Sequence, residues 1–444
     1  MARESWASRI GFILAAVGSA VGLGNVWRFP WMTAEYGGSA FLVVYLCIVL
    51  LVGVPGLLAE FVIGRRSHRN PAGALARLAP GTKSWGYVGL FGVVTALVLL
   101  SFYSVVGGWI VRYFAASFTG SYFAAPGGYF ETISFGWEAV AFHAVFLGMT
   151  ALVVLGGVRG GIEKATKVMM PVIILLLATL AGWAITQSGA GDGLSFFLDF
   201  DVETLQAAVE HDPVGLLQAA AGQALFTLSL GVGTMITYAS YLGEDNSLPF
   251  DGSVIAVLNT GVGVLAGLVV FPLLFAFQGG LNDTSAGGGP GALFVSIAGA
   301  FTQVPYGRVV AVAFFAAILF AALSSSISML EIPVAYLVDE QDVSRRNATI
   351  GLAGFVLLTG GVCALRPSLF TFVADTLVNL MLTAGLAGFL VFAGWILGTD
   401  ALSEFDSGAG GLARSLGTPW LWSVRTVLPL FLLVTLAVNL YSLL

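Results

Sequence analysis

The sequence predicts an all-α polytopic membrane protein with two helices that are broken near their middle. Of its 444 residues, 58% are hydrophobic and only 9% are charged, and the mean hydropathy is +0.94. An ordinary soluble domain carries roughly 25% charged residues. Several apolar runs are long enough to cross a bilayer, and glycine-rich polar segments interrupt two of them. These three observations define the fold class.

A membrane-spanning helix needs roughly 20 largely apolar residues. Eleven runs satisfy this condition, at 7–35, 39–64, 85–117, 138–156, 164–187, 215–242, 250–279, 305–337, 345–365, 372–399 and 421–443. We expect one transmembrane domain over 1–444. Within it, we expect two repeats of five helices, at 7–187 and 215–399, and an eleventh helix at 421–443.

The positive charges indicate the orientation of these helices. If the N-terminus is cytoplasmic, fourteen of the 18 Lys and Arg residues lie at the cytoplasmic end, and four lie outside. Those four are Arg28, Arg112, Arg308 and Arg366. Cytoplasmic loops of membrane proteins carry such an excess of positive charge. We therefore expect a cytoplasmic N-terminus, an extracellular C-terminus and a place in the cell membrane.

Two longer segments, 188–214 and 280–304, would lie on the outside. The first carries six acidic residues and no Lys or Arg, which favours a partly helical lid or, equally, a solvated loop. The net charge of −6 and the lack of a sustained basic stretch argue against a nucleic-acid partner. The two cysteines and three histidines have neither disulfide nor zinc-ligand spacing.

The first interruption lies in residues 15–31, AAVGSAVGLGNVWRFPW, where three glycines accompany Asn25, Arg28 and Pro30. Glycines in membrane helices often serve close packing. Asparagine and arginine, however, are costly in lipid and need polar partners. Backbone groups released by a broken helix must be buried in protein or face a polar cavity. This segment therefore predicts a binding site.

A second interruption lies half a chain later, in residues 222–243, GQALFTLSLGVGTMITYASYLG. It places Ser229, Gly231 and Gly233 in the middle of the sixth span. Interrupted segments at corresponding places in two halves are typical of inverted-repeat transporters, in which the substrate binds between the repeats.

Several long motifs can be compared with a known family. They are GSAVGLGNVWRFP in the first helix, GGSAFLVVYL and GLLAEFVIGR in the second, GGIEKATKVMMP in the fifth, FTLSLGVGTMITYASY in the sixth and SSSISMLEIPVAYLVDE in the eighth. With them the chain resembles the neurotransmitter:sodium symporter family, in its eleven-helix prokaryotic branch of transporters for hydrophobic amino acids. The resemblance implies the leucine-transporter-type fold of five plus five inverted helices, with helices one and six unwound.

The resemblance implies two sodium sites. The first would be formed by Ala20, Asn25, Thr227 and Asn259, and the second by Gly18, Val21, Ala321, Ser324 and Ser325. Ser324 departs from the family, which commonly has threonine there, but a serine hydroxyl also offers lone pairs to a cation. None of these residues is a carboxylate. In the family the substrate's own carboxylate touches the first sodium ion, so that each stabilises the binding of the other.

The resemblance also implies the substrate site. Its residues would be Ser19, Ala20, Gly22, Leu23, Gly24, Leu99, Tyr103, Phe226, Thr227, Ser229, Val232, Ser325 and Met329. Tyr103 and the N–H groups of Leu23 and Gly24 would hold the carboxylate, since helix N-termini favour anions. The remaining wall has no charged residue, which favours neutral substrates. Met329 repacks easily, so leucine-like and aromatic side chains both fit this expectation.

Gating roles follow from the same resemblance. At the outer end they fall on Arg28, Asp375, Gln223 and Phe226, with Gln223 paired to Arg28 and Phe226 closing over the substrate. At the inner end they fall on Arg3, Asp339 and Trp6. Glu60 would brace the unwound backbone of the sixth helix.

One position departs from the family pattern. Gly263 stands where the family has either a chloride-coordinating serine or a substituting carboxylate. Dependence on chloride is therefore left open at this point, as is the oligomeric state.

These features together favour a sodium-coupled symporter that imports neutral, hydrophobic or aromatic amino acids by alternating access. An enzyme is disfavoured because none of the histidines lies near the breaks. A channel would need a continuous polar lining, whereas the polar groups cluster at mid-membrane. A membrane sensor that binds the same solute without transporting it has an identical site, so it stays as the alternative.

Overall fold

The computed structural model describes residues 5–79, 81–243, 245–278 and 291–441, and all regular structure in these ranges is helical. Nine of the described helices are long and apolar enough to cross a membrane, and a bent pair at residues 9–35 makes a tenth. The all-α polytopic class expected from the sequence is confirmed.

The first half of the chain supplies five spans, three of which contain a short π-helical turn (labelled η). Its elements are α1 (Arg9–Ala20), η1 (Gly24–Arg28), α2 (Phe29–Glu35), α3 (Ser39–Ile48), η2 (Val49–Gly53), α4 (Val54–Ser67), α5 (Pro71–Leu78), α6 (Gly86–Thr119), α7 (Pro126–Ser134), α8 (Trp137–Leu155), η3 (Val158–Glu163) and α9 (Lys164–Ala184).

The second half begins with two short helices over the segment expected to be a lid. Its elements are α10 (Ala190–Leu198), α11 (Val202–His211), α12 (Pro213–Thr227), α13 (Thr234–Ala239), α14 (Leu248–Gln278), α15 (Ala292–Gln303), α16 (Gly307–Gln341), α17 (Arg345–Leu365), α18 (Pro367–Thr371), η5 (Phe372–Leu377), α19 (Val378–Val391), η6 (Phe392–Leu397), α20 (Thr399–Asp406), α21 (Gly411–Ser415), α22 (Gly417–Arg425) and α23 (Val427–Tyr441).

The sixth expected span, at 215–242, is divided between α12 and α13. Neither piece is long enough to cross the bilayer alone, because a spanning helix needs roughly 20 residues. Because of this division, the described residues contain ten continuous or bent spans, whereas eleven were expected. The fifth and tenth spans begin earlier than the apolar runs suggest, at Val158 and Pro367.

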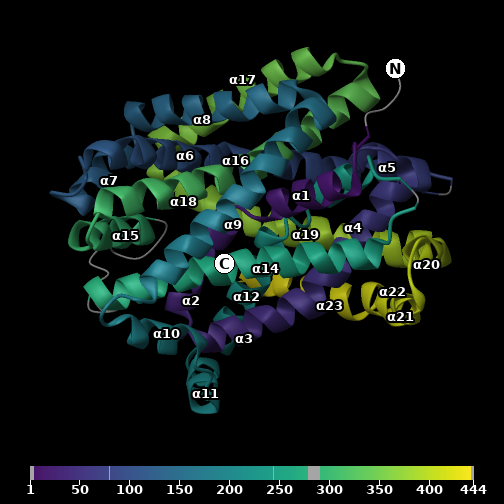
Figure 1. Ribbon diagram of the computed structural model, residues 1–444. Helices are drawn as coiled ribbons and strands as arrows, with labels where there is room; N and C mark the ends of the chain where they lie inside the picture. Colours follow the sequence, from purple (N-terminus) through teal and green to yellow (C-terminus); the bar gives the residue numbers. More distant parts are fainter. Residues whose placement is uncertain (1–4, 80, 244, 279–290, 442–444) are drawn as a thin grey trace.

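The two broken helices lie inside the bundle. The long helices α6 and α16 pack along one another, and α8, α9 and α17 lie against them. Helix α1 packs against α9, α14 and α16, while α13 packs against α4. In Figure 1, α5 and α20 lie at one end of the bundle, and α7 and α15 lie at the other.

Candidate functional site

The first membrane helix is interrupted between α1 and η1, and its two halves are bent by 47°. Side chains hold the released backbone N–H groups: Leu23 donates to the Tyr103 hydroxyl, and Gly22 donates to Asn25 Oδ1, each at 3.1 Å. Such partners are needed because no water is present in the bilayer core. Glycine is required at position 22, since a Cβ there would lie 2.2 Å from Ser325 Oγ.

The sixth helix is interrupted between α12 and α13. Ser229, Gly231 and Gly233 have φ angles of 53°, 86° and 80°, a left-handed region that strongly favours glycine. The Gly231 N–H donates to Glu60 Oε1 at 2.7 Å. Glu60 itself is fully buried on α4. The structure therefore places the Glu60 carboxyl at the break in the sixth helix, which is where we expected it from the sequence.

Oxygen atoms of the residues expected at the first sodium site converge where the two breaks meet. The oxygen end of the Asn259 amide lies 3.1 Å from the Ala20 carbonyl oxygen and 3.3 Å from that of Thr227. Asn25 Nδ2 donates to the same amide oxygen at 2.9 Å. Turned over, the amide would donate to both carbonyls. In either orientation of the Asn259 amide, the carbonyl oxygens of Ala20 and Thr227 lie beside the amides of Asn25 and Asn259, and neutral oxygens of this kind suit a hard cation.

The residues expected at the second sodium site also lie together. Ser324 Oγ is 3.2 Å from the Val21 carbonyl oxygen and 2.9 Å from that of Ala321. Ser325 Oγ is 3.2 Å from the same Val21 oxygen. Gly18 is close by, because a Cβ on it would lie 3.4 Å from Ser324 Cβ. The groups that meet at the two sites are backbone carbonyls, serine hydroxyls and side-chain amides, all of which are neutral.

Gly263 lies beside the first of these sites. A Cβ at this position would be 3.7 Å from Asn25 Nδ2 and 3.7 Å from the Phe29 ring. Glycine thus presents neither a hydroxyl nor a carboxylate next to Asn25.

The side chains expected to contact the substrate are buried, with Phe226 half-buried, and Tyr103, Ser229 and Ser325 among them bond the backbone of the first break. They are Ser19, Leu99, Tyr103, Thr227, Ser229, Val232, Ser325 and Met329, beside the backbone of Ala20, Gly22, Leu23 and Gly24. None is charged. Burying a charge without a partner is costly, so a wall of this kind favours a neutral side chain on the ligand.

Serine hydroxyls connect the first helix to the sixth and the eighth. Ser229 and Ser325 both donate to the Ser19 carbonyl at 2.9 Å, and Ser19 Oγ donates to Ser328 Oγ at 2.7 Å. Ser328 was not among the residues expected at the site from the sequence. It follows Ser325 by three residues, which places both on one face of α16, so helical spacing could have indicated it.

At one end of the site, Arg28 covers the half-buried Phe226 with its guanidinium carbon 5.2 Å from the ring centre. Arg28 Nη2 donates to Asn379 Oδ1 at 3.3 Å. Arg28, Asp375 and Asn379 line a cavity of about 200 Å³ together with residues of α12 and α23. Asp375 thus shares the cavity with Arg28, but the two side chains form no ion pair within the described ranges.

The expected pairing of Gln223 with Arg28 is not present. Instead, Gln223 Nε2 donates to the Gly24 carbonyl at 2.7 Å, and its Oε1 has no partner within the described ranges. The Gly24 carbonyl, at the first residue of η1, accepts the Phe29 N–H and this amide N–H together, because a carbonyl oxygen has two lone pairs.

Trp6 closes the opposite end of the site. Its indole Nε1 donates to the Tyr238 carbonyl at 2.9 Å, its backbone N–H donates to the Tyr241 carbonyl at 3.3 Å, and its ring meets the Tyr238 ring edge to face. Asp339 accepts from the Asn70 backbone N–H at 3.2 Å. Arg3, its expected partner, lies outside the described residues.

Two buried carboxylates at this end were not assigned from the sequence. Glu331 is fully buried and receives Arg345 through two hydrogen bonds, at 2.7 and 2.9 Å, and the Tyr241 hydroxyl at 3.0 Å. Glu163 accepts from the Ala7 backbone N–H at 2.7 Å. The contacts of Tyr241 with Glu331 and of Ala7 with Glu163 join segments far apart in the sequence and hold the Trp6 end together.

Two broken helices that face each other inside a membrane bundle, with oxygen atoms converging between them, define a secondary transporter of the broken-helix class. The model of the sodium:neurotransmitter symporter family matches residues 3–124 and 134–442. The chain therefore belongs to this family and is a sodium-dependent membrane transporter, not an enzyme.

Individual relatives agree with this placement. An uncharacterized sodium-dependent transporter of Bacillus subtilis is 35% identical over 97% of this chain and 96% of its own length. One of Methanocaldococcus jannaschii is 32% identical over 97% of this chain and 89% of its own length. The crystal structure of MhsT in complex with L-phenylalanine superposes with a TM-score of 0.85, at 39% identity, over 98% of this chain and 99% of MhsT.

The contact between Glu60 and the sixth-helix break yields a test. Glu60→Leu leaves the buried Gly231 N–H without an acceptor, which we expect to cost about 1–3 kcal/mol of stability. Glu60→Gln keeps an acceptor oxygen and should cost less than ~1 kcal/mol. Thermal unfolding of the purified protein measures both changes. Equal losses in the two variants would show that the hydrogen bond does not support the break.

Proposed function

We propose that the protein is a symporter that couples sodium entry to the uptake of a neutral, hydrophobic or aromatic amino acid. The observation that carries this proposal is the convergence of oxygens around Asn259, next to a buried wall without charged side chains. Sodium dependence is a property of the family. The substrate class and two sodium sites are our inference from the geometry.

In this proposal the amino-acid carboxylate lies at the first break. The Tyr103 hydroxyl and the N-terminal turn of η1, with Gly24, provide donors there, and helix N-termini favour anions. The carboxylate also supplies the negative charge that the first sodium site lacks. Sodium and substrate therefore stabilise each other, and this coupling free energy links the sodium gradient to uptake.

The amino group is matched by neutral acceptors. Ser19 lies at the position that meets it in the family, and the carbonyls of Ala20, Phe226 and Thr227 are further acceptors nearby. The substrate side chain would contact Leu99, Val232 and Met329, which are buried and apolar. The structural match to MhsT, which was crystallised with L-phenylalanine, supports an aromatic or large aliphatic substrate.

Alternating access follows from the two ends of the site. We assign the Trp6 end to the cytoplasm, because the excess of Lys and Arg lies there. In the structure this end is closed by the hydrogen bonds of Trp6, while a cavity remains beside Arg28 at the opposite end. Transport requires these closures to exchange, as rigid helix pieces move about the breaks.

Uptake into proteoliposomes tests the proposed function. With an inward sodium gradient, labelled phenylalanine should accumulate above its external concentration, and without the gradient it should only equilibrate. Lysine and glutamate should compete poorly, because the site has no charged partner for their side chains. Sodium-dependent binding without gradient-driven accumulation would contradict transport and favour the sensor.

The residue assignments have a separate test. Asn25→Ala and Ser325→Ala each remove a side chain from one sodium site, so the sodium concentration needed for half-maximal substrate binding should rise about tenfold or more. Ser326→Ala is the matched control, because its hydroxyl lies one residue from Ser325 but bonds Thr150 and Leu323. Unchanged sodium dependence in both site variants would contradict the assignments.

A further inference from the structure

A second polar cavity, of about 390 Å³, lies at the Trp6 end of the molecule and shares no residue with the transport site. Its volume falls within the roughly 300–1,000 Å³ of known ligand pockets. It is lined by the end of α4, by α5 and by α20, with the residues Arg65, Arg66, His68, Arg77, Leu78 and Glu404. We call it the α4–α20 cavity.

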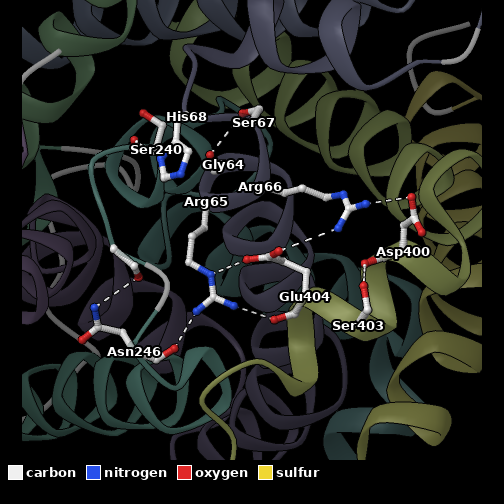
Figure 2. Close-up of polar contacts among 11 residues, drawn as sticks. Gly64, Arg65, Arg66, Ser67, His68, Ser240, Asn246, Asp400, Ser403 and Glu404 are labelled. Carbon is white, nitrogen blue, oxygen red and sulfur yellow. Dashed lines mark hydrogen bonds and ion pairs between the residues drawn. The ribbon is translucent and has the colours of Figure 1, made fainter. Parts of the chain in front are cut away.

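The positive charge of Arg65 is neutralised by a carboxylate within the protein. Arg65 is fully buried, and its Nε pairs with the Glu404 carboxylate. Its other nitrogens donate to the carbonyls of Asn246 and Glu404, at 2.5 Å each. Figure 2 shows this guanidinium enclosed between α20 and the segment around Asn246. Glu404 also lies 3.9 Å from Arg66 Nη1, so two arginines share this carboxylate. With Asp400 counted, the three arginines of the cavity exceed the nearby carboxylates by one positive charge.

Arg66 and Arg77 keep donors for a ligand. Arg66 reaches Asp400 at 2.8 Å, but the two side chains are 30% and 63% exposed, and exposed ion pairs contribute little stability. Arg77 uses Nη1 for the Ser67 carbonyl, at 3.2 Å. Each guanidinium carries five N–H donors in total, so most are available to a ligand.

His68 adds a third group with an unusual backbone. Its φ of 51° places it in the left-handed region, where side chains other than glycine are uncommon. Its Nδ1 lies 3.2 Å from the Ser240 carbonyl at the end of α13, as Figure 2 shows. This contact leaves Nε2 as the second polar atom of the ring. The left-handed backbone ends helix α4, since the His68 N–H donates to the Gly64 carbonyl, and this ending directs the chain from α4 toward α5.

We propose that the α4–α20 cavity binds a phosphate-bearing anion through the guanidinium groups of Arg66 and Arg77, with His68 beside them. The planar fork of arginine matches phosphate oxygens with paired hydrogen bonds. Either a phospholipid headgroup or free phosphate offers this chemistry. Helix α22, which packs against α20, exposes Trp422, and tryptophan is typical of a membrane interface.

A bound anion would connect the end of α4 to α5, because Arg66 belongs to the one and Arg77 to the other. His68, between them, already contacts the end of α13, the inner half of the broken sixth helix. Helix α20 faces Arg66 with the carboxylates of Asp400 and Glu404, which would compete with the anion for this guanidinium. Occupancy would therefore hold α4 and α5 together beside α13.

Binding is tested on the full-length protein by thermal unfolding. Inorganic phosphate is titrated at constant ionic strength in detergent, and nanodiscs of phosphatidylglycerol are compared with nanodiscs of phosphatidylcholine. We expect a higher unfolding temperature with at least one phosphate source. In Arg66→Gln/Arg77→Gln, the apparent affinity should fall about tenfold or more, because charge-assisted hydrogen bonds are lost.

Arg69→Gln is the matched control. It removes the same charge from the same loop, but Arg69 pairs with Glu340 at 3.3 Å and does not line the cavity. Its response should equal that of the wild type. If the double glutamine variant does not fold, Arg66→Lys/Arg77→Lys retains the charge and should still bind more weakly, because lysine lacks the fork.

The possible outcomes distinguish a lipid headgroup from free phosphate and show whether the cavity binds either one. A shift with phosphatidylglycerol only assigns a lipid headgroup, and a shift with inorganic phosphate assigns free phosphate. No shift in the wild type, or equal weakening in Arg69→Gln and in the cavity variants, overturns the proposal. Phenylalanine binding is measured on the same samples, so a failure of the proposed transport function is recognised independently.

Discussion

The satisfaction of backbone polar groups at two helix breaks is the constraint on which the rest of the structure depends. In a membrane interior, no water is present to form hydrogen bonds with an N–H or carbonyl group that a helix break releases. The N–H groups are met by side chains, namely the Tyr103 hydroxyl, the Asn25 amide and the Glu60 carboxylate. Carbonyls of the first break and of Thr227 face the amide of Asn259 or the serine hydroxyls of α16. The same break thus creates both donors for an anion and oxygens for a cation.

The ends of the site follow from this arrangement. In the alternating access that we propose, contacts at one end of the site form while those at the other end open, since packed interfaces have discrete arrangements. At the Trp6 end, Trp6 donates to the carbonyls of Tyr238 and Tyr241, and Glu163 accepts from the backbone N–H of Ala7. At the opposite end, Arg28 lies over Phe226 beside a cavity. The structure therefore describes a state closed at the Trp6 end.

Apolar run length and glycine placement were sufficient to predict the fold class, most spans and both breaks, because these properties are local. The partners of polar side chains were harder to predict. Gln223 bonds the Gly24 carbonyl instead of Arg28, and Glu331 pairs with Arg345. Such choices depend on which groups the tertiary structure leaves unpaired. The α4–α20 cavity could not be predicted from the sequence for the same reason, because its walls come from segments more than 300 positions apart.

The central claim is that sodium and substrate share one site and stabilise each other across the two breaks. Equilibrium binding measured in both directions tests it most directly. Saturating sodium should raise phenylalanine affinity, and saturating phenylalanine should raise sodium affinity by the same factor, because linkage is reciprocal. Phenylalanine binding that is independent of sodium, with sodium affinity unaffected by phenylalanine, would contradict the account.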